Sequence, residues 1–235
     1  MTITSCTVDL IEALTPTVNR ILLTPQQPVS YASGQYLQLC LSDSDKRPFS
    51  IASMPGDKQI ELHIGGAVAD QYASQAIAHL MQQYQLKQPV KAEVGLGNAH
   101  FRADSTKPVI LLAGGTGFSY IYSIAQSIAA AALDRPVFVY WGVREQNALY
   151  HASVMQQWAA QNAKYRFIPV VQHPDDNWHG RSGMVHQAVL DDFVSLEAYD
   201  IYVAGPFAMA GVVRDAFIEQ GAHREQLFGD AFAYI

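Results

Sequence analysis

The fold of this chain is decided by the stretch Val109-Ile110-Leu111-Leu112-Ala113-Gly114-Gly115-Thr116-Gly117-Phe118-Ser119. An apolar run stops at three glycines, and apolar residues then recur at helical spacing. This pattern predicts a buried strand, a glycine turn and a helix. Because glycine has no Cβ, a ligand can approach the backbone, and the free N–H groups of the helix favour an anion such as a pyrophosphate. The stretch therefore predicts a nucleotide site, although it is not G-x-G-x-x-G and a plain turn of an α/β protein would fit it too.

The composition is that of a globular protein. The 235 residues are 49% hydrophobic and 15% charged, with a formal net charge of −6. This length allows one large domain or two small ones with a sizeable core. Lys and Arg do not cluster, so we expect no nucleic-acid partner. Residues 108–133 carry no charge and are long enough to cross a bilayer, but their glycine turn favours a strand and a buried helix, so we expect no membrane association.

The cysteines and the amino terminus favour a cytoplasmic protein. Cys6 and Cys40 are the two cysteines, and they lie in alternating segments without C-x-x-C spacing. This placement predicts buried free thiols rather than a disulfide or a metal site. Residues 1–10 lack the basic patch and apolar core of a secretory signal.

The first hundred residues alternate between apolar and polar in period two, which is typical of an antiparallel barrel or sandwich. We expect an antiparallel Greek-key β-barrel over residues 1–102. One helix interrupts the strands, with Asp70 as its N-cap. Its expected apolar stripe, closing one end of the barrel, consists of Ala73, Ile77, Leu80, Met81 and Tyr84. The expected strands are 2–14, 18–24, 35–41, 47–53, 59–64 and 89–94.

From Pro108 onward, strand and helix patterns alternate, which predicts a parallel, Rossmann-like sheet with right-handed crossovers over residues 108–235. The expected strands are 109–113, 137–141, 166–171 and 200–204. The polar segment 102–107 is the expected boundary between the two domains. In such a sheet, ligands bind outside the carboxyl ends of the strands.

Three further segments place chemically useful residues at strand ends. In Arg47-Pro48-Phe49-Ser50, the arginine offers an anchor for an anionic or carbonyl-rich ligand, the phenylalanine a ring and the serine a hydroxyl. A surface arginine followed by an ordinary strand accounts for that segment equally well. The other two segments, 140–144 and 202–209, end strands in Gly142 and Gly205. Together with the glycine turn, these glycines predict a crevice in which a ligand approaches the backbone along the edge of the sheet.

These segments resemble the ferredoxin-NADP reductase superfamily, and within it the NAD(P)H:flavin oxidoreductases of the Fre and LuxG type. The superfamily's Arg-x-Tyr-Ser motif corresponds to residues 47–50, Gly-Gly-Thr-Gly to 114–117, and Cys-Gly-Pro-x-x-Met to 204–209. The ending Phe228-Gly229-Asp230-Ala231-Phe232-Ala233-Tyr234-Ile235 is similar to the flavin reductase subgroup. The resemblance runs nearly end to end and implies a flavin-binding barrel followed by an NAD(P)H-binding α/β domain.

The resemblance also implies residue roles. Ser50 would be the catalytic residue, with its hydroxyl on the flavin N5 that receives the hydride. The implied flavin-binding residues are Tyr36, Arg47, Pro48, Phe49, Ser50, His63, Ile64, Gly65, Thr116 and Phe232. The implied nicotinamide-nucleotide-binding residues are Gly114, Gly115, Thr116, Gly117, Phe118, Gly142, Arg144, Gly205, Pro206 and Met209. Catalysis would consist mainly of stacking the two rings with the reacting atoms ~3–3.5 Å apart.

Two departures from the superfamily pattern have consequences. Ala204 replaces the cysteine before Gly-Pro, so a thiol contribution is absent. Tight flavoproteins of the superfamily hold the flavin phosphate with basic or hydroxyl residues, whereas this chain has Gly65-Gly66-Ala67-Val68-Ala69-Asp70. A carboxylate at a helix N-terminus repels a phosphate by about 1 kcal/mol or more. We therefore expect that riboflavin, FMN or FAD is exchanged as a substrate and is not a prosthetic group.

The expected function is NAD(P)H-dependent reduction of free flavin. The reduced flavin would supply an acceptor such as a luciferase, a monooxygenase or ferric complexes. One alternative is a tightly bound flavoprotein that passes electrons to an iron–sulfur or haem partner, and two cysteines cannot hold such a cluster within this chain. Another is a non-catalytic nucleotide sensor. The choice between NADH and NADPH stays open, because Arg144 reads either a 2′-phosphate or only solvent.

Other sites are disfavoured by the sequence. We expect no metal site, because no H-E-x-x-H occurs and His173 and His179 flank a loop. Ser50 is not in a G-x-S-x-G elbow, which argues against a hydrolase. Residues 178–183 predict a turn leading to a helix capped near Ser182. Tyr120 and Tyr122 are expected to pack a helix rather than to bind a ring.

Overall fold

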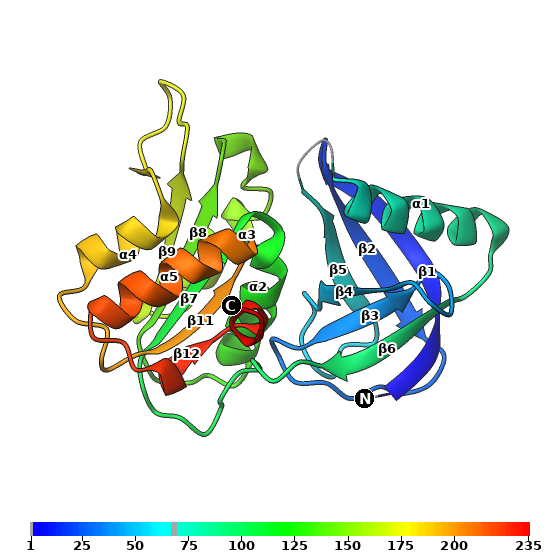
Figure 1. Cartoon of the computed structure of the whole chain (residues 1–235), viewed down its shortest axis with the longest axis horizontal. Helices are drawn as coiled ribbons and strands as arrows, with labels where there is room; N and C mark the ends of the chain where they lie inside the picture. Colours follow the sequence, from blue (N-terminus) through cyan, green and yellow to red (C-terminus); the bar gives the residue numbers. More distant parts are fainter. Residues whose placement is uncertain (1, 67–69) are drawn as a thin grey trace.

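The computed structural model describes residues 2–66 and 70–235. It contains a six-stranded antiparallel sheet of order β4-β3-β6-β1-β2-β5 and a six-stranded parallel sheet of order β10-β9-β8-β7-β11-β12. The two lie side by side in Figure 1, and the expected fold class, a barrel followed by a Rossmann-like domain, is confirmed.

The N-terminal barrel is built from alternating strands, which bury every second side chain. Its strands are β1 (Thr2–Thr15), β2 (Val18–Pro25), β3 (Tyr36–Cys40), β4 (Lys46–Ser50), β5 (Ile60–Gly65) and β6 (Val90–Leu96). Leu37 and Leu39 of β3 are completely buried in its core. After β4 the chain returns beside β5, where the Ala52 N–H donates to the Glu61 carbonyl at 2.8 Å and brings the two edge strands together. The strand expected over 47–53 therefore ends at Ser50, because Ala52 pairs outside the β3–β4 ladder.

Helix α1 (Gln71–Leu86) begins as predicted, with the Asp70 carboxylate accepting the backbone N–H groups of Tyr72 and Ala73. The expected apolar stripe is correct at its start but wrong at Met81 and Tyr84, which are 43% and 48% exposed. Figure 1 shows the reason, because α1 packs over β1 and β5 and its last turns extend past the sheet. The helix buries Ala73, Ala76 and Leu80.

The Rossmann-like domain has a central parallel sheet covered on both faces. Its strands are β7 (Val109–Gly114), β8 (Val137–Val143), β9 (Tyr165–Val171), β10 (Arg181–Ser182), β11 (Asp200–Ala204) and β12 (Leu227–Phe228). Its helices are α2 (Phe118–Ala130), α3 (Ala152–Ala160), α4 (Val185–Asp192) and α5 (Phe207–Glu219). Helices α2 and α3 pack on one face, and α4 and α5 on the other. This double cover explains why residues 109–113 are continuously apolar and completely buried.

Four short helical turns complete the described chain. They are η1 (Gly115–Gly117), η2 (Gln146–Ala148), η3 (Arg224–Gln226) and η4 (Asp230–Ala233). The first of these continues β7 directly, so the glycine turn is a single 3₁₀ turn between strand and α2.

The helix expected to be capped near Ser182 begins later. Arg181 and Ser182 instead pair with Val170 and Val171 as the short parallel strand β10. Helix α4 then starts at Val185, behind a Met184 N-cap whose side chain makes no capping hydrogen bond.

Both cysteines are free thiols. Cys6 is completely buried, and burial raises the pKa of its thiol to about 12. Cys40 is only partly buried, so the expectation of a buried thiol is wrong at that position. Over residues 2–66 and 70–235, no helix has the length and apolar character needed to span a membrane.

Candidate functional site

The two domains meet along helix α2. The Ser123 hydroxyl donates to the Ser53 carbonyl at 2.7 Å, and the Gln126 side-chain amide donates to the Ala52 carbonyl at 2.9 Å. Both acceptors lie just after β4, so α2 holds the segment that follows Ser50. Tyr120 of the same helix is 1% exposed and donates to the Ala99 carbonyl, which confirms that it packs the helix.

The glycine turn touches the barrel at the end of β5. The Thr116 hydroxyl donates to the Gly65 carbonyl at 3.4 Å. Gly65 itself is required by the barrel, because a Cβ there would overlap the Thr17 carbonyl. The structure thus brings together two residues that the resemblance assigned to flavin.

Ser50 lies at the end of β4, where it pairs with Tyr36 of β3. Ala52 pairs with Glu61 of β5, and the two segments run in opposite directions. Ser50, two residues before Ala52, therefore lies near the level of His63, two residues after Glu61. In the part of the chain that the structure describes, the Ser50 hydroxyl makes no hydrogen bond. It is therefore available to a ligand.

Arg47 and Phe49 point away from Ser50, because side chains alternate along β4. The Arg47 guanidinium makes four hydrogen bonds, to both carboxylate oxygens of Asp45, the Tyr72 carbonyl and the Gln75 side chain. It is 8% exposed. These contacts fix α1 to the barrel, so the structure does not group the Arg47 side chain with Ser50. Pro48 is exposed on the other face of β4.

His63 lies between the two domains. Its side chain is completely buried, with Nε2 at 2.9 Å from Glu61 Oε1 and Nδ1 at 3.2 Å from the Tyr150 hydroxyl. Its ring stacks on Phe118, with 6.2 Å between the ring centroids. Phe118 and the neighbouring Ile64 are completely buried, so both side chains pack the protein rather than face a ligand.

Around His63 the structure assembles an interdomain polar cluster, which we define as Arg20, Glu61, His63, Tyr150 and His151. Burial by itself would raise the pKa of Glu61, but hydrogen bonds from His63 and Arg20 lower it to about 2. Burial lowers the pKa of His151, and the neighbouring His63 lowers it further. Sequence reasoning missed four of these five residues, because they come from three segments that only the packing of the domains brings together.

Four glycines at the strand ends are packed closely against the protein itself. A Cβ on Gly142 would lie 2.6 Å from Val185 Cβ, and one on Gly114 would lie 2.5 Å from Met209 Sδ. Gly205 meets the same methionine, and Gly117 meets the Ala204 carbonyl. The chain itself therefore needs glycine at these four positions, and their role toward a nucleotide stays a prediction.

Gly115 is different. It has φ +55°, and a Cβ placed on it would meet nothing within 4 Å. Among the five glycines at the ends of β7, β8 and β11, Gly115 is the one beside which the described protein leaves space for a ligand to approach the backbone.

The remaining predicted nucleotide residues lie at one edge of the parallel sheet. Gly114 pairs with Gly142, and Ala113 with Ala204, so the ends of β7, β8 and β11 are level. Arg144 is exposed just after β8, and Pro206 is exposed before α5.

The C-terminal segment meets the barrel beside Tyr36. Gly97 separates them, because a Cβ on it would lie 2.9 Å from both Tyr36 Cε1 and Asp230 Oδ1. Burial raises the pKa of Asp230 to about 6, while a hydrogen bond from the Ala99 N–H opposes that rise. Asp230 was not among the predicted site residues. Phe232 is partly buried and packs against the α4–α5 face of the sheet.

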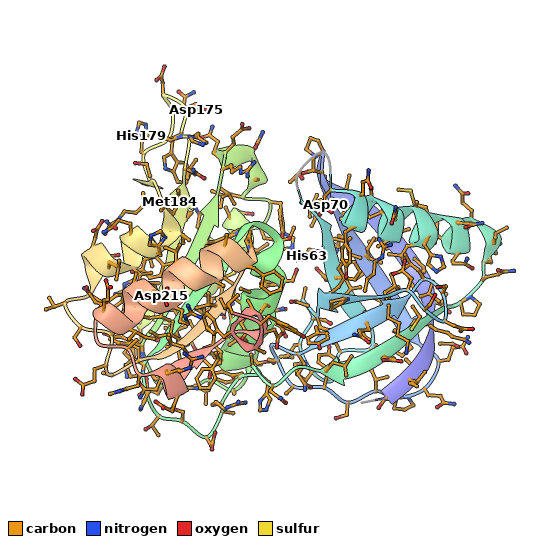
Figure 2. All side chains as sticks on the ribbon, viewed as in Figure 1. His63, Asp70, Asp175, His179, Met184 and Asp215 are labelled. Atoms are coloured by element: carbon orange, nitrogen blue, oxygen red, sulfur yellow. The ribbon has the colours of Figure 1, made fainter. Side chains whose placement is uncertain are left out.

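The two histidines weighed for a metal site lie elsewhere. His173 and His179 are exposed in the loop between β9 and β10. Figure 2 places His179 near the tip of that loop, away from His63.

Comparisons with known proteins agree with this arrangement. Residues 111–215 match the family described as the oxidoreductase NAD-binding domain. An NAD(P)H-flavin reductase from Aliivibrio fischeri is 42% identical over 98% of this chain and 99% of its own length. One from Vibrio harveyi is 40% identical over 98% of each chain. Among solved structures, an Amycolatopsis cytochrome P450 reductase superposes with a TM-score of 0.85 at 26% identity, covering 97% of this chain and 69% of that one.

Proposed function

The chain belongs to the family of NAD(P)H-flavin reductases, and we propose from this that it transfers hydride from NADH or NADPH to a flavin. The observation that carries the proposal is 42% identity to such a reductase over nearly the whole of both chains. The contact between Thr116 of the glycine turn and Gly65 of the barrel supports it, because that contact joins the two halves that must bring the rings together.

In this proposal the flavin ring lies against the barrel, residues 1–102, and the nicotinamide nucleotide against residues 108–235. The unpaired Ser50 hydroxyl donates to flavin N5, and Tyr36, Thr116 and the main chain at residues 63–65 frame the ring. Arg47 and Phe49 support β4 from behind, as their contacts with α1 suggest. The nucleotide runs along Gly115 and the exposed Arg144 and Pro206. The protein contributes geometry rather than acid or base chemistry.

We also propose that the flavin is a diffusible substrate. Two groups that would hold a flavin phosphate are already occupied by the chain itself. The N-terminus of α1 is capped by the Asp70 carboxylate, and the Arg47 guanidinium is bound by Asp45 and Gln75. Residues 67–69 of the predicted phosphate-repelling segment lie outside the described residues. If neither group binds the flavin phosphate, riboflavin, FMN and FAD should all be reduced.

The released product would then serve another cytoplasmic reaction. Reduced flavin leaving a loose site can supply a luciferase or another flavin-dependent monooxygenase, or reduce ferric complexes. Each of these acceptors requires that the reduced flavin leave the protein.

The test is steady-state oxidation of NADH and NADPH by the purified chain, with riboflavin, FMN and FAD varied over micromolar concentrations. We expect turnover with all three flavins and little flavin bound to the purified protein. Stoichiometric FAD that resists dialysis would support the tightly bound flavoprotein instead. Absence of turnover would favour the nucleotide sensor.

A further inference from the structure

Three potential metal ligands meet inside the interdomain polar cluster. One ligand atom each from Glu61, His63 and His151 lies within 4.8 Å of the other two. Glu61 and His63 belong to β5 of the barrel, whereas His151 directly precedes α3 of the Rossmann-like domain. Figure 2 shows His63 between the two domains, so a bound ion would bridge them.

The donor set suits a divalent transition metal. Two imidazole nitrogens and one carboxylate oxygen are a recurrent three-ligand set for Zn²⁺, with a fourth position left for water. Imidazole also suits Cu²⁺ and Ni²⁺, whereas Ca²⁺ and Mg²⁺ prefer oxygen ligands throughout.

Each ligand is also oriented by a second hydrogen bond, as metal ligands in proteins generally are. His63 Nδ1 lies 3.2 Å from the Tyr150 hydroxyl, and His151 Nδ1 lies 3.2 Å from the Tyr150 carbonyl. Glu61 Oε2 accepts from Arg20 at 2.8 Å. These contacts leave Nε2 of His151 for an ion, whereas His63 Nε2 and Glu61 Oε1 lie 2.9 Å apart in a hydrogen bond that the ion would replace.

The charges of the cluster act in both directions. The Glu61 carboxylate attracts a cation. Arg20 carries a positive charge that opposes a cation. Its hydrogen bond to Glu61 already balances that carboxylate, so we expect moderate affinity.

We propose that Glu61, His63 and His151 bind a divalent transition-metal ion of the Zn²⁺ class, and that this ion links the two domains. The inference departs from the expectation of no metal site, which considered only histidines close in sequence. It does not depend on the proposed activity. Because Gly65, two residues after His63, accepts a hydrogen bond from Thr116, a bound ion should also restrain the glycine turn.

The test is isothermal titration of the untagged, chelator-treated full chain with ZnCl₂. We expect one ion per chain. The variant His151→Ala should weaken binding more than about 100-fold, because it removes one of the three ligands, and even changes to groups that only orient a ligand typically cost 10–100-fold. The matched control is His179→Ala, which removes an exposed loop histidine and should bind as the wild type does.

A second measurement guards against a folding defect. His151→Ala should keep the wild-type circular dichroism and thermal unfolding in chelator, because the His151 side chain is only partly buried and makes no capping bond. Co²⁺ should give the intense visible absorption of a low-coordinate site with the wild type and lose it with this variant. No Zn²⁺ binding by the wild type, or equal binding by His151→Ala, would overturn the proposal.

Discussion

Ser50 differs from the neighbouring serines in what its hydroxyl contacts. Ser53 and Ser123 are bound within the chain, Ser53 to Tyr31 and Ser123 to the Ser53 carbonyl. The Ser50 hydroxyl has no partner among residues 2–66 and 70–235. A polar group left unpaired at a domain boundary is free to recognise a ligand, and this is why we assign it to flavin N5.

The variant Ser50→Ala should reduce flavin turnover about 10- to 100-fold, because one hydrogen bond at the reacting atom is worth about 1.5–3 kcal/mol when it strengthens in the transition state. Nicotinamide binding should change little. The measurement is kcat with FMN and the affinity for NAD⁺, with the exposed Ser44→Ala as control. Unchanged kcat in Ser50→Ala would remove this residue from the mechanism.

Asp230 gives a prediction with a defined pH dependence. Burial raises its folded pKa from 3.8 to about 6. The unfolded chain therefore loses this proton more readily, so the ionised group costs stability as pH rises from about 4 to 6, and the cost is complete above that range. A shift of this size corresponds to at most about 3 kcal/mol, and partial exposure reduces it to about 1–2 kcal/mol.

Asp230→Asn should therefore raise Tm at pH 7.5 and leave it nearly unchanged at pH 4, as measured by thermal unfolding across that range. The exposed Asp176→Asn should shift neither. A Tm gain that is equal at both pH values would show that ionisation is not the cause.

At the scale of elements, two glycines differ in how closely the neighbouring side chains pack against them. Gly142 faces Val185 of α4, and a methyl group there would lie 2.6 Å from its Cβ. Gly142→Ala should destabilise the fold by about 1–3 kcal/mol through overpacking. Gly211 of α5 has nothing nearer than 3.8 Å, so Gly211→Ala should stabilise it by about 0.5–1 kcal/mol. Urea unfolding of both variants measures this, and a neutral Gly142→Ala would show that packing against Val185 does not require glycine there.

The N-terminus of α1 tests the loose-flavin proposal. Asn caps a helix as well as Asp does, so Asp70→Asn removes the charge and keeps the cap. If about 1 kcal/mol of repulsion acts on the flavin phosphate, KM for FMN should fall about five-fold relative to KM for riboflavin. The exposed Asp43→Asn should leave this ratio unchanged. An unaltered ratio in Asp70→Asn would place the phosphate elsewhere.

Most elements follow from local pattern, and the errors arise where packing between elements decides. The period-two strands, the buried run 109–113 and the Asp70 cap are all readable from neighbours in the chain. The exposure of Tyr84 depends on where the sheet under α1 ends, which no local pattern records. The approach of His63 to His151 depends on how the domains pack, so the sequence offered no signal for it.

At the scale of the whole molecule, α2 couples the domains through few but buried contacts. Ser123 and Gln126 satisfy the carbonyls of Ser53 and Ala52, and Ser123 is completely buried. Removing both side chains leaves these two carbonyl groups without a hydrogen-bond donor. Each unpaired carbonyl should lower the free energy of unfolding by about 1–3 kcal/mol. The barrel and the Rossmann-like domain should then unfold separately.

The tryptophans allow that separation to be measured, because all three, Trp141, Trp158 and Trp178, belong to the Rossmann-like domain. In the wild type, tryptophan fluorescence and far-ultraviolet circular dichroism should give coincident urea transitions. In the double variant Ser123→Ala/Gln126→Ala the two curves should diverge, since circular dichroism reports both domains. The control Ser153→Ala/Gln156→Ala, on the exposed face of α3, should keep them coincident. Coincident curves in the α2 variant would mean that the ring contacts of His63 with Phe118 couple the domains without these hydrogen bonds.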